Sequence, residues 1–447
     1  MKFHGTMKIN DLGHLEVGGC DTVDLAKRYG TPLYIFDETK MRATCREYYN
    51  AFTEKYHNAQ VLYASKAFLT TAVCRIIEEE GLGLDVVSGG ELYTALKAGF
   101  PMDRVYFHGN NKTPEELRMA LDNEVGRIVV DNFYELEILD ALARERHCVP
   151  EVLLRITPGV EAHTHDYIRT GQIDSKFGFT LPNGQALEAV KAVKEKHVSF
   201  RGVHCHIGSQ IFEMESYVHA VDVMVQFVAD IKRETGLAVE ELNLGGGFGI
   251  YYSDGDQPAA VEEYADMVMA RVKEKTEEFE LLSPRVLVEP GRSIAGPAGS
   301  TLYTIGSVKE IPGVRKYVAV DGGMTDNIRP ALYQAKYEVI LANKADRELE
   351  QTVSITGKCC ESGDMLAWDV ELPQTEAGDL MLMPCTGAYG YSMANNYNRL
   401  TKPGAVLVKD GQAELIIKAE TYQDLIRNDV MPERLAKKKE VCLQSIG

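Results

Sequence analysis

The sequence predicts an α/β protein whose larger part is a (β/α)8 TIM barrel, followed by a C-terminal all-β, Greek-key barrel-like domain that the N-terminal segment completes. Eight short apolar runs end in polar or glycine-rich clusters, and stretches with helical spacing separate most of them, which favours the barrel. After Arg292, helical spacing becomes rare and Gly and Pro separate short apolar segments, which favours the β domain. We expect the barrel at 33–297 and the β domain at 1–32 and 298–447.

The eight runs are rich in Val, Ile, Leu and Tyr and are too short for buried helices, so we expect parallel strands. In order, they are Val61–Lys66, Gly83–Val87, Arg104–Gly109, Arg127–Asn132, Val152–Ile156, Phe200–Gly208, Glu241–Gly247 and Arg285–Gly291. Eight repeats indicate a closed barrel, whereas fewer would indicate an open doubly wound sheet, which is the alternative fold.

Apolar residues at helical spacing predict the covering helices. The clearest stretches are Leu69–Glu80, Pro114–Asp122, Tyr134–Glu145, Gly184–Lys196, Tyr217–Glu234 and Val261–Lys275. Thr113 and Glu116 have the spacing of a capping box, which predicts that a helix begins there.

Short apolar segments predict the strands of the β domain. They are Lys316–Val320, Thr352–Thr356, Asp379–Pro384, Ala405–Val408 and Ala413–Ile417. The first thirty residues, with a turn at Gly18–Gly19, are expected to pair with this domain.

Composition excludes several classes of partner. The 447 residues include 66 acidic and 48 basic side chains, a net charge of −18, whereas nucleic acids and anionic membranes are bound by clustered Lys and Arg. No apolar run reaches the roughly 18 residues of a membrane span, and residues 1–16 lack the apolar stretch of a signal peptide. Nine cysteines at irregular spacings indicate reduced thiols. We expect a cytoplasmic protein without nucleic-acid or membrane partners, in which only the basic tail at Lys437–Lys439 has a disordered composition.

In a (β/α)8 barrel, catalytic groups lie where the strands end and the βα loops converge. In this sequence those positions hold Lys66, Asp85, His108, Arg155, His206, Gly245–Gly247, Glu289 and Arg292. A purely structural barrel would usually end its strands in Asn, Asp, Gly or Ser. The convergence of charged residues and glycines therefore indicates a site more strongly than any single residue.

Lys66 would suit covalent attachment of a carbonyl cofactor, with a pKa depressed by burial so that the amine is nucleophilic. Considered alone, a snorkelling lysine is the more frequent case. Gly245–Gly247 would let backbone N–H groups approach a phosphate, although a tight turn explains an isolated glycine triplet equally well. The pattern is not G-x-G-x-x-G, so it does not predict a nicotinamide site.

His204 and His206 are two residues apart on an expected strand and share one face. They could form a metal pair, as in barrel hydrolases, but the neighbouring strand ends lack a metal-type spacing. Alternatively, one histidine stacks on a cofactor ring beside a phosphate-binding turn at Ser209. His163 and His165 lie in a polar loop, where solvated side chains are the simpler interpretation.

Glu289, in Glu289-Pro-Gly-Arg292, could hydrogen-bond the ring nitrogen of a pyridine cofactor and keep it protonated, which makes the ring a better electron sink. A surface Glu–Arg pair of little energetic value is the alternative. In the β domain, Cys360 offers a thiol acid beside Glu361, and Tyr389 offers a phenol among small residues. A buried strand cysteine and a glycine-lined turn are the structural alternatives for these two motifs.

These motifs occur together in one family. The chain resembles the diaminopimelate decarboxylases, within the alanine-racemase-like (fold type III) group of pyridoxal-phosphate enzymes, from about Gly5 to about Asp424. The motifs that carry the resemblance are Tyr63-Ala-Ser-Lys66, Asp85-Val-Val-Ser-Gly-Gly-Glu91, His204-Cys-His206-Ile-Gly-Ser209, Gly245-Gly-Gly-Phe248, Glu289-Pro-Gly-Arg292, Asn327-Ile-Arg329-Pro-Ala-Leu-Tyr333, Cys360-Glu-Ser-Gly-Asp364 and Gly387-Ala-Tyr389. Each motif alone is weak, but all of them in this order are highly specific.

The resemblance implies pyridoxal 5'-phosphate as the cofactor and a homodimer with shared active sites, in which Cys360 and Glu361 reach into the partner's site. It implies as catalytic residues Lys66, Glu289, His206 and Cys360, the last protonating the carbon that loses CO2. It implies as cofactor-binding residues Lys66, Asp85, His206, Ser209, Gly245, Gly246, Gly247, Glu289, Gly291, Arg292 and Tyr389. Backbone N–H groups of Gly245–Gly247, Ser209 and Tyr389 would bind the phosphate.

Ornithine, arginine and lysine decarboxylases share this scaffold, so the substrate is a separate question. Diaminopimelate carries both an ammonium and a carboxylate at its far end. The resemblance places Arg292, Arg329 and Tyr333 at that carboxylate and Glu361 at that ammonium, and it includes Tyr389 among the substrate-binding residues. Because unpaired buried charges are costly, the arginines favour decarboxylation of meso-2,6-diaminopimelate to L-lysine and CO2, the last step of lysine biosynthesis. No metal is expected.

Overall fold

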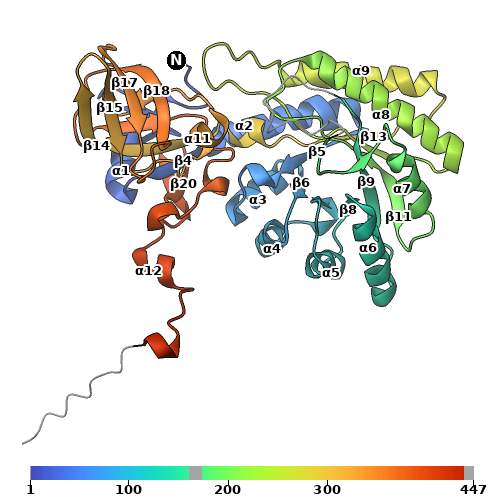
Figure 1. Ribbon diagram of the computed structural model, residues 1–447. Helices are drawn as coiled ribbons and strands as arrows, with labels where there is room; N and C mark the ends of the chain where they lie inside the picture. The colour runs from blue at the N-terminus through green and yellow to red at the C-terminus, as the bar shows by residue number, and fades with distance from the viewer. Residues whose placement is uncertain (1, 161–173, 437–447) are drawn as a thin grey trace, which may run out of the picture.

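The computed structural model describes residues 2–160 and 174–436, so His163, His165 and Lys437–Lys439 lie outside the described residues. Two lobes lie side by side, a barrel with its helices and a β-rich lobe (Figure 1). Within the described parts of the chain, no helix is both long and apolar enough to cross a membrane.

Eight parallel strands form a closed barrel, as predicted. They are β5 (Ala59–Ala64), β6 (Gly83–Val86), β7 (Val105–Phe107), β8 (Arg127–Val130), β9 (Glu151–Thr157), β11 (Ser199–His204), β12 (Glu241–Asn243) and β13 (Arg285–Val288). Pairing of β13 with β5 and of β8 with β9 closes the ring, while the short β10 (Phe179–Thr180) lies beside β9. Several predicted runs extend beyond the observed strands into the βα loops that form the site.

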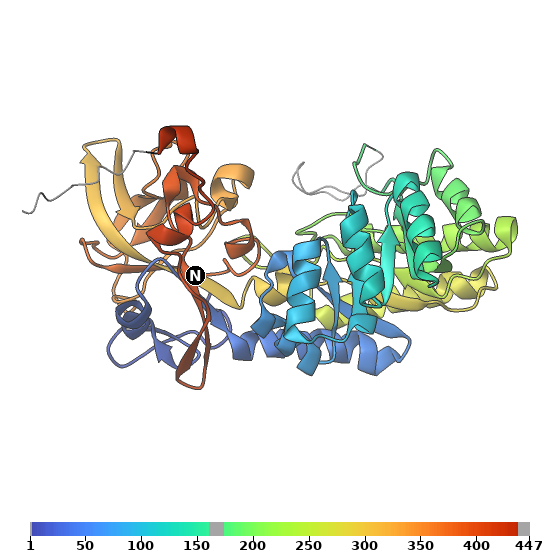
Figure 2. The same ribbon diagram turned by 90° about the horizontal axis from the view of Figure 1, so that it is seen from below.

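Helices cover the outside of the barrel (Figure 2). They are α2 (Glu38–Tyr48), α3 (Thr71–Glu79), α4 (Gly89–Ala98), α5 (Pro114–Asp122), α6 (Phe133–Arg146), α7 (Gln185–Val193), α8 (Met214–Thr235) and α9 (Val261–Glu278). The capping box is confirmed: Glu116 N donates to Thr113 Oγ1 over 3.2 Å, and Thr113 N donates to Glu116 Oε2 over 2.9 Å. The cap fixes where α5 begins.

Both ends of the chain build the β lobe. Its strands are β4 (Leu33–Asp37), β14 (Gly299–Ile311), β15 (Arg315–Val320), β16 (Ile340–Leu341), β17 (Gln351–Thr356), β18 (Met365–Leu372), β19 (Leu380–Met383), β20 (Gly404–Lys409) and β21 (Gln412–Ile417). β4 runs antiparallel to β14 and parallel to β20. Residues 33–37, which we expected to open the barrel, therefore lie in this sheet, because β4 is buried along its length between these two strands.

The first residues join the β lobe mainly by packing. β1 (Lys8–Ile9), β2 (Leu15–Val17) and β3 (Cys20–Asp21) form a separate three-stranded sheet, followed by α1 (Thr22–Tyr29). Leu15 belongs to the same buried cluster as Leu302. The expected association of the N-terminus with the β lobe is therefore present, although its link to the main sheet is β4.

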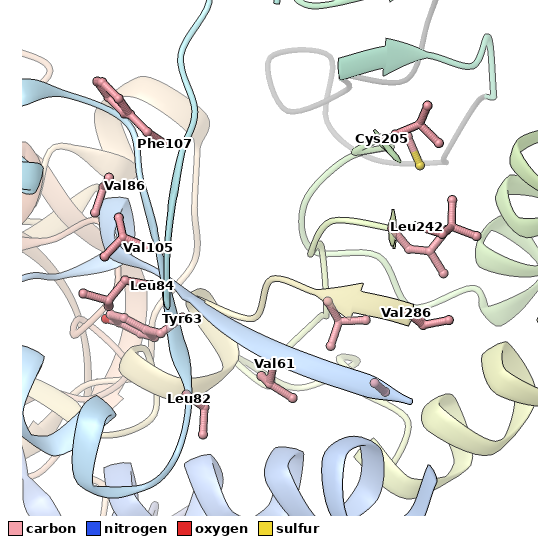
Figure 3. Close-up of a cluster of buried hydrophobic side chains, with 14 of the residues drawn as sticks. Val61, Tyr63, Leu82, Leu84, Val86, Val105, Phe107, Cys205, Leu242 and Val286 are labelled. Carbon is pink, nitrogen blue, oxygen red and sulfur yellow. The ribbon is translucent and has the colours of Figure 1, made fainter. Parts of the chain in front are cut away.

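The barrel wall is packed on both sides. Leu62, Tyr106 and Leu153 belong to a small buried cluster contributed by strands on several sides of the ring. A second, larger cluster includes side chains of the same strands, such as Val61 and Val286 (Figure 3). Because close-packed interiors deform little, the strand ends give the loops above them fixed positions.

Candidate active site

The predicted strand-end residues converge on two connected cavities, of about 620 and 270 Å3. Lys66, Phe177, His206 and Glu289 line both. The larger cavity is also lined by Ser209, Gly246, Gly247, Gly291, Arg292, Arg329, Tyr333 and Tyr389, and the smaller by Asp85, His108, Arg155 and His204. Gly245 lies next to these cavities, because a Cβ placed on it would be 2.9 Å from Nδ1 of the cavity-lining His206.

Lys66 lies in a short 3-10 turn (Ser65–Ala67) directly after β5. Burial acts to lower its pKa, but the negative charges of Asp85 and Glu289 outweigh burial and raise the pKa above its ordinary value. The expectation of a depressed pKa is therefore wrong for this structure, because the sequence did not show that the charges of two carboxylates from other strands act on the amine. Burial in turn raises the pKa of Asp85.

Glu289 lies just past β13 and is 6% exposed. Asn243 Nδ2 donates to its Oε1 over 2.7 Å, and His204 Nε2 lies in hydrogen-bond contact with Oε2 at 3.1 Å. His108 Nε2 is 2.9 Å from Oε1. Burial acts to raise the pKa of Glu289, but His108 and His204 outweigh it and hold the pKa well below its ordinary value. The carboxylate is thus kept ionised in a buried site.

His206 and the glycine loop pack against each other. Gly246 N donates to His206 Nδ1 over 3.2 Å, and Gly245 N donates to Asn243 Oδ1 over 2.9 Å. Two of the three amides that we expected to face a phosphate therefore donate within the protein, because the loop folds back on its own strand. Burial and the charges of Lys66 and Arg155 hold the pKa of His206 well below its ordinary value, so its ring is neutral.

Tyr389 enters the site from the β lobe, in a left-handed conformation with φ of 59°. Its amide donates to the carbonyl of Ala67 over 2.9 Å. Assignment of this amide to a phosphate is therefore wrong here, since the bond ties the β lobe to the turn that carries Lys66. The ring of Tyr389 still lines the larger cavity.

Two arginines lie at the side of the cavity that the β lobe forms. Arg292 and Arg329 are 6% and 7% exposed, and no carboxylate among the described residues lies within ion-pair distance of either. Arg292 donates to Tyr252 Oη over 2.6 Å and to Ser209 Oγ over 2.9 Å. The Arg329 guanidinium lies 5.5 Å from the ring centre of Tyr252. Two buried cations held by phenols and hydroxyls form a site for an anion.

Cys360 and Glu361 are both exposed, and neither lines the two cavities that the described residues form. Cys360 N donates to Asn398 Oδ1 over 2.7 Å, and Asp364 anchors the same loop by accepting from Cys359 N over 2.7 Å. Within one chain, these two predicted residues are therefore not brought to the site.

Sequence reasoning missed Asn243, Tyr252 and Phe177. Asn243 is an amide within an apolar strand, Glu241-Leu-Asn-Leu, and that pattern could have marked it. Tyr252 and Phe177 lie outside helices and strands, and nothing in their spacing distinguishes them from packing aromatics. Phe177 packs under the Arg155 guanidinium at 4.2 Å.

The groups present fit pyridoxal phosphate. An ionised carboxylate can accept a ring N–H, Lys66 supplies an amine, and Ser209 with Arg292 supplies donors for a phosphate. A Cβ on Gly246 would lie 2.2 Å from the Glu289 carbonyl oxygen, so only glycine allows the loop to pass this close to the backbone of Glu289. His108, His204 and Glu289 also place ligand atoms within 4.8 Å of one another, the arrangement behind the metal-hydrolase alternative.

Comparison with known proteins decides between these alternatives. Residues 41–296 match the family model of the pyridoxal-binding domain of pyridoxal-dependent decarboxylases. The chain is 55% identical to diaminopimelate decarboxylase of Bacillus subtilis (strain 168), over 96% of this chain and 98% of that protein. It is 53% identical to that of Halalkalibacterium halodurans, over 99% and 100%.

A solved structure agrees. Diaminopimelate decarboxylase of M. jannaschii in complex with L-lysine superposes with a TM-score of 0.91 at 37% identity, covering 98% of this chain and 100% of that one. The match spans both lobes and the whole site. The chain therefore belongs to the diaminopimelate decarboxylase family of pyridoxal-phosphate-dependent enzymes.

Proposed function

We propose that this protein decarboxylates meso-2,6-diaminopimelate to L-lysine and CO2, with pyridoxal phosphate as its cofactor. The observation that carries the substrate choice is the buried pair Arg292 and Arg329, for which the described residues offer no carboxylate partner. The far carboxylate of diaminopimelate would supply that partner. Lysine and ornithine carry only an ammonium at their far end and would leave Arg329 without an anionic partner, which disfavours a decarboxylase of another basic amino acid.

Different residues of the chain have different roles around the cofactor. Bound pyridoxal phosphate supplies an electron sink for the bond pair left by the departing carboxylate. Lys66 holds the cofactor covalently between turnovers, and the ionised Glu289 holds a proton on the ring nitrogen. The neutral ring of His206 packs against the cofactor, while Ser209 and Arg292 bind at its phosphate end. These residue roles are part of the proposal.

The proposal includes a homodimer. Cys360 and Glu361 are exposed and line neither site cavity of their own chain, which supports a role at the site of another copy. There, the Cys360 thiol would donate a proton to the carbon that has lost CO2, and Glu361 would pair with the far ammonium of the substrate. We also infer a barrel and a β lobe that divide the chain near residues 38 and 298, and a cytoplasmic location, which the free thiols of the described cysteines support.

The test is release of CO2 from meso-diaminopimelate by the purified holoenzyme, compared with lysine, ornithine and arginine. We expect turnover on diaminopimelate to be far faster than on the other three amino acids. Faster turnover on lysine or ornithine would overturn the substrate assignment.

Borohydride reduction should fix the cofactor on Lys66, as peptide mapping would show. The Lys66→Ala variant should lose both the fixed label and turnover. A Lys66→Ala protein that decarboxylated at the wild-type rate would refute the role of Lys66.

A further inference from the structure

The Glu289 carboxylate is surrounded by three side chains that are not among the catalytic or cofactor-binding residues implied by the family resemblance. Asn243 and His108 approach Oε1 at 2.7 and 2.9 Å, and His204 approaches Oε2 at 3.1 Å. All three are buried, with exposures of 0%, 3% and 1%. Such a dense set of nitrogen groups around one carboxylate exceeds what packing of a strand end requires.

The distances fix the protonation of the ring of His204. Its Nε2 faces an ionised carboxylate, so Nε2 carries the hydrogen and donates it. Its Nδ1 is buried and has no hydrogen-bond partner in the part of the chain that the structure describes. Burial lowers the pKa of His204 to about 4, so the ring stays neutral at physiological pH. A neutral donor of this kind stabilises the carboxylate without removing its charge.

His108 separates two carboxylates. Its Nε2 lies 2.9 Å from Glu289 and 3.7 Å from Asp85, and its ring meets that of His204 edge-on with centres 4.8 Å apart. Without it, Glu289 and Asp85 would face each other in a buried site, and like charges there favour protonation of one of them. A protonated Glu289 would no longer supply the negative charge that holds a proton on the ring nitrogen of the cofactor.

We propose that His204, together with His108 and Asn243, acts as a positioning residue that keeps the Glu289 carboxylate ionised and in one orientation toward the cofactor ring nitrogen. The inference rests on the cofactor seat of the proposed function, and it gives these three residues a specific task within it. It requires that a donor, and not merely a side chain of similar size, stand at position 204.

The experiment compares His204→Leu, which fills the space without a donor, with His204→Gln, which retains an N–H donor. The apoprotein is titrated with pyridoxal phosphate and with its carbocyclic analogue, in which CH replaces the ring nitrogen. The ratio of the two dissociation constants reports the contact between Glu289 and the ring nitrogen, and it needs no substrate. His4→Gln, which alters a buried histidine elsewhere, is the matched control.

We expect the wild-type preference for the natural cofactor to fall about tenfold or more in His204→Leu, because hydrogen bonds to charged groups are the strong ones. His204→Gln and His4→Gln should keep the preference. With diaminopimelate, His204→Leu should lower kcat and leave KM nearly unchanged. If His204→Leu does not fold, the pair Asn243→Leu and Asn243→Gln makes the same comparison at the donor to Oε1.

An unchanged ratio in a folded leucine variant would overturn the proposal, as would a wild-type protein without any preference between the two compounds. A wild-type protein that shows the expected ratios but does not decarboxylate diaminopimelate would leave the positioning role standing and refute the proposed substrate.

Discussion

Arg329 is 7% exposed, and its guanidinium lies beside the rings of Tyr252, Tyr333 and Tyr389. We expect Arg329→Ala to reduce kcat/KM for meso-diaminopimelate about 100- to 1000-fold, because a substrate carboxylate would lose its buried partner. Turnover of lysine should change little, so the preference between the two substrates should collapse. Arg315→Ala, which removes an arginine that pairs with Asp369 at the exposed edge of the β lobe, is the control. Retained preference in Arg329→Ala would contradict the substrate assignment.

His4 couples stability to pH. Burial and the charges of Lys2 and Lys40 lower its pKa to about 4, so the folded protein holds it neutral. In the unfolded chain it titrates near 6.5, so the unfolded state gains a proton first as the pH falls, and stability is lost between about pH 6.5 and 4. Between pH 7.5 and 5, we expect the free energy of unfolding of His4→Gln to fall by about 1–2 kcal/mol less than that of the wild type. Urea denaturation at a series of pH values measures this.

His219→Gln, at an exposed position on α8, should follow the wild-type curve. An identical pH dependence in His4→Gln and wild type would show that His4 is already neutral, or equally charged, in both states.

At the level of single residues, sequence reasoning found those whose type and position both carry chemistry. Lys66, Glu289 and His206 follow barrel strands, and the geometry of the barrel brings such positions together. Tyr252 could not be found in this way, because its role depends on Arg292 lying 2.6 Å away although it is forty residues distant in the chain. The raised pKa of Lys66 was missed for the same reason, since it depends on carboxylates from two other strands.

The loop after β12 shows how an element constrains the site. A Cβ on Gly246 would lie 2.2 Å from the backbone oxygen of Glu289, and backbone cannot yield as a side chain can. We expect Gly246→Ala to weaken cofactor binding about ten- to a hundredfold, since overpacking costs roughly 1–3 kcal/mol. Absorbance titration of the apoprotein measures this.

Gly90→Ala, in α4, is the control for that variant: its Cβ would meet no atom closer than 3.7 Å. It should keep cofactor affinity and gain up to about 1 kcal/mol of stability, because alanine favours a helix over glycine. Equal affinities in the two alanine variants would show that the loop can move aside.

Among elements, the barrel was the most predictable part. A strand buried on both faces is a continuous apolar run, and α5 begins at its capping box. β14 was missed because only its first half is buried, whereas Ser307–Glu310 are exposed and include only one apolar residue, Val308. β18 was missed because its pairing with β17 is interrupted by register shifts, which break the alternation of buried and exposed residues. Leu33–Asp37 was assigned to the wrong lobe because a buried strand does not show which sheet it joins.

At the scale of the whole molecule, the proposed dimer determines whether two inactive variants can complement each other. Lys66 acts in its own chain, while Cys360 would act in the partner's site. A mixed dimer of Lys66→Ala and Cys360→Ala therefore holds one site with both defects and one site with neither. With random exchange, the mixture should recover about one quarter of wild-type turnover, although each variant alone is inactive.

Each variant exchanged only with itself is the control for this mixture. Absence of recovery, with exchange of subunits demonstrated by differently tagged chains, would place Cys360 and Lys66 in the same chain's site or exclude Cys360 from the reaction.

The position of β4 has a consequence for the order in which the protein is made. β4 lies between β14 and β20, so both of its neighbours are synthesised only after β13, the last strand of the barrel. At about 5–20 residues per second, extension from Asp37 to Gly404 takes on the order of half a minute. Leu33–Asp37 lacks both strand partners until Gly299–Ile311 is made and lacks β20 until the end of that time, whereas the last barrel strand is complete at Val288. The lobe that carries Arg329 is therefore the last to become native during synthesis.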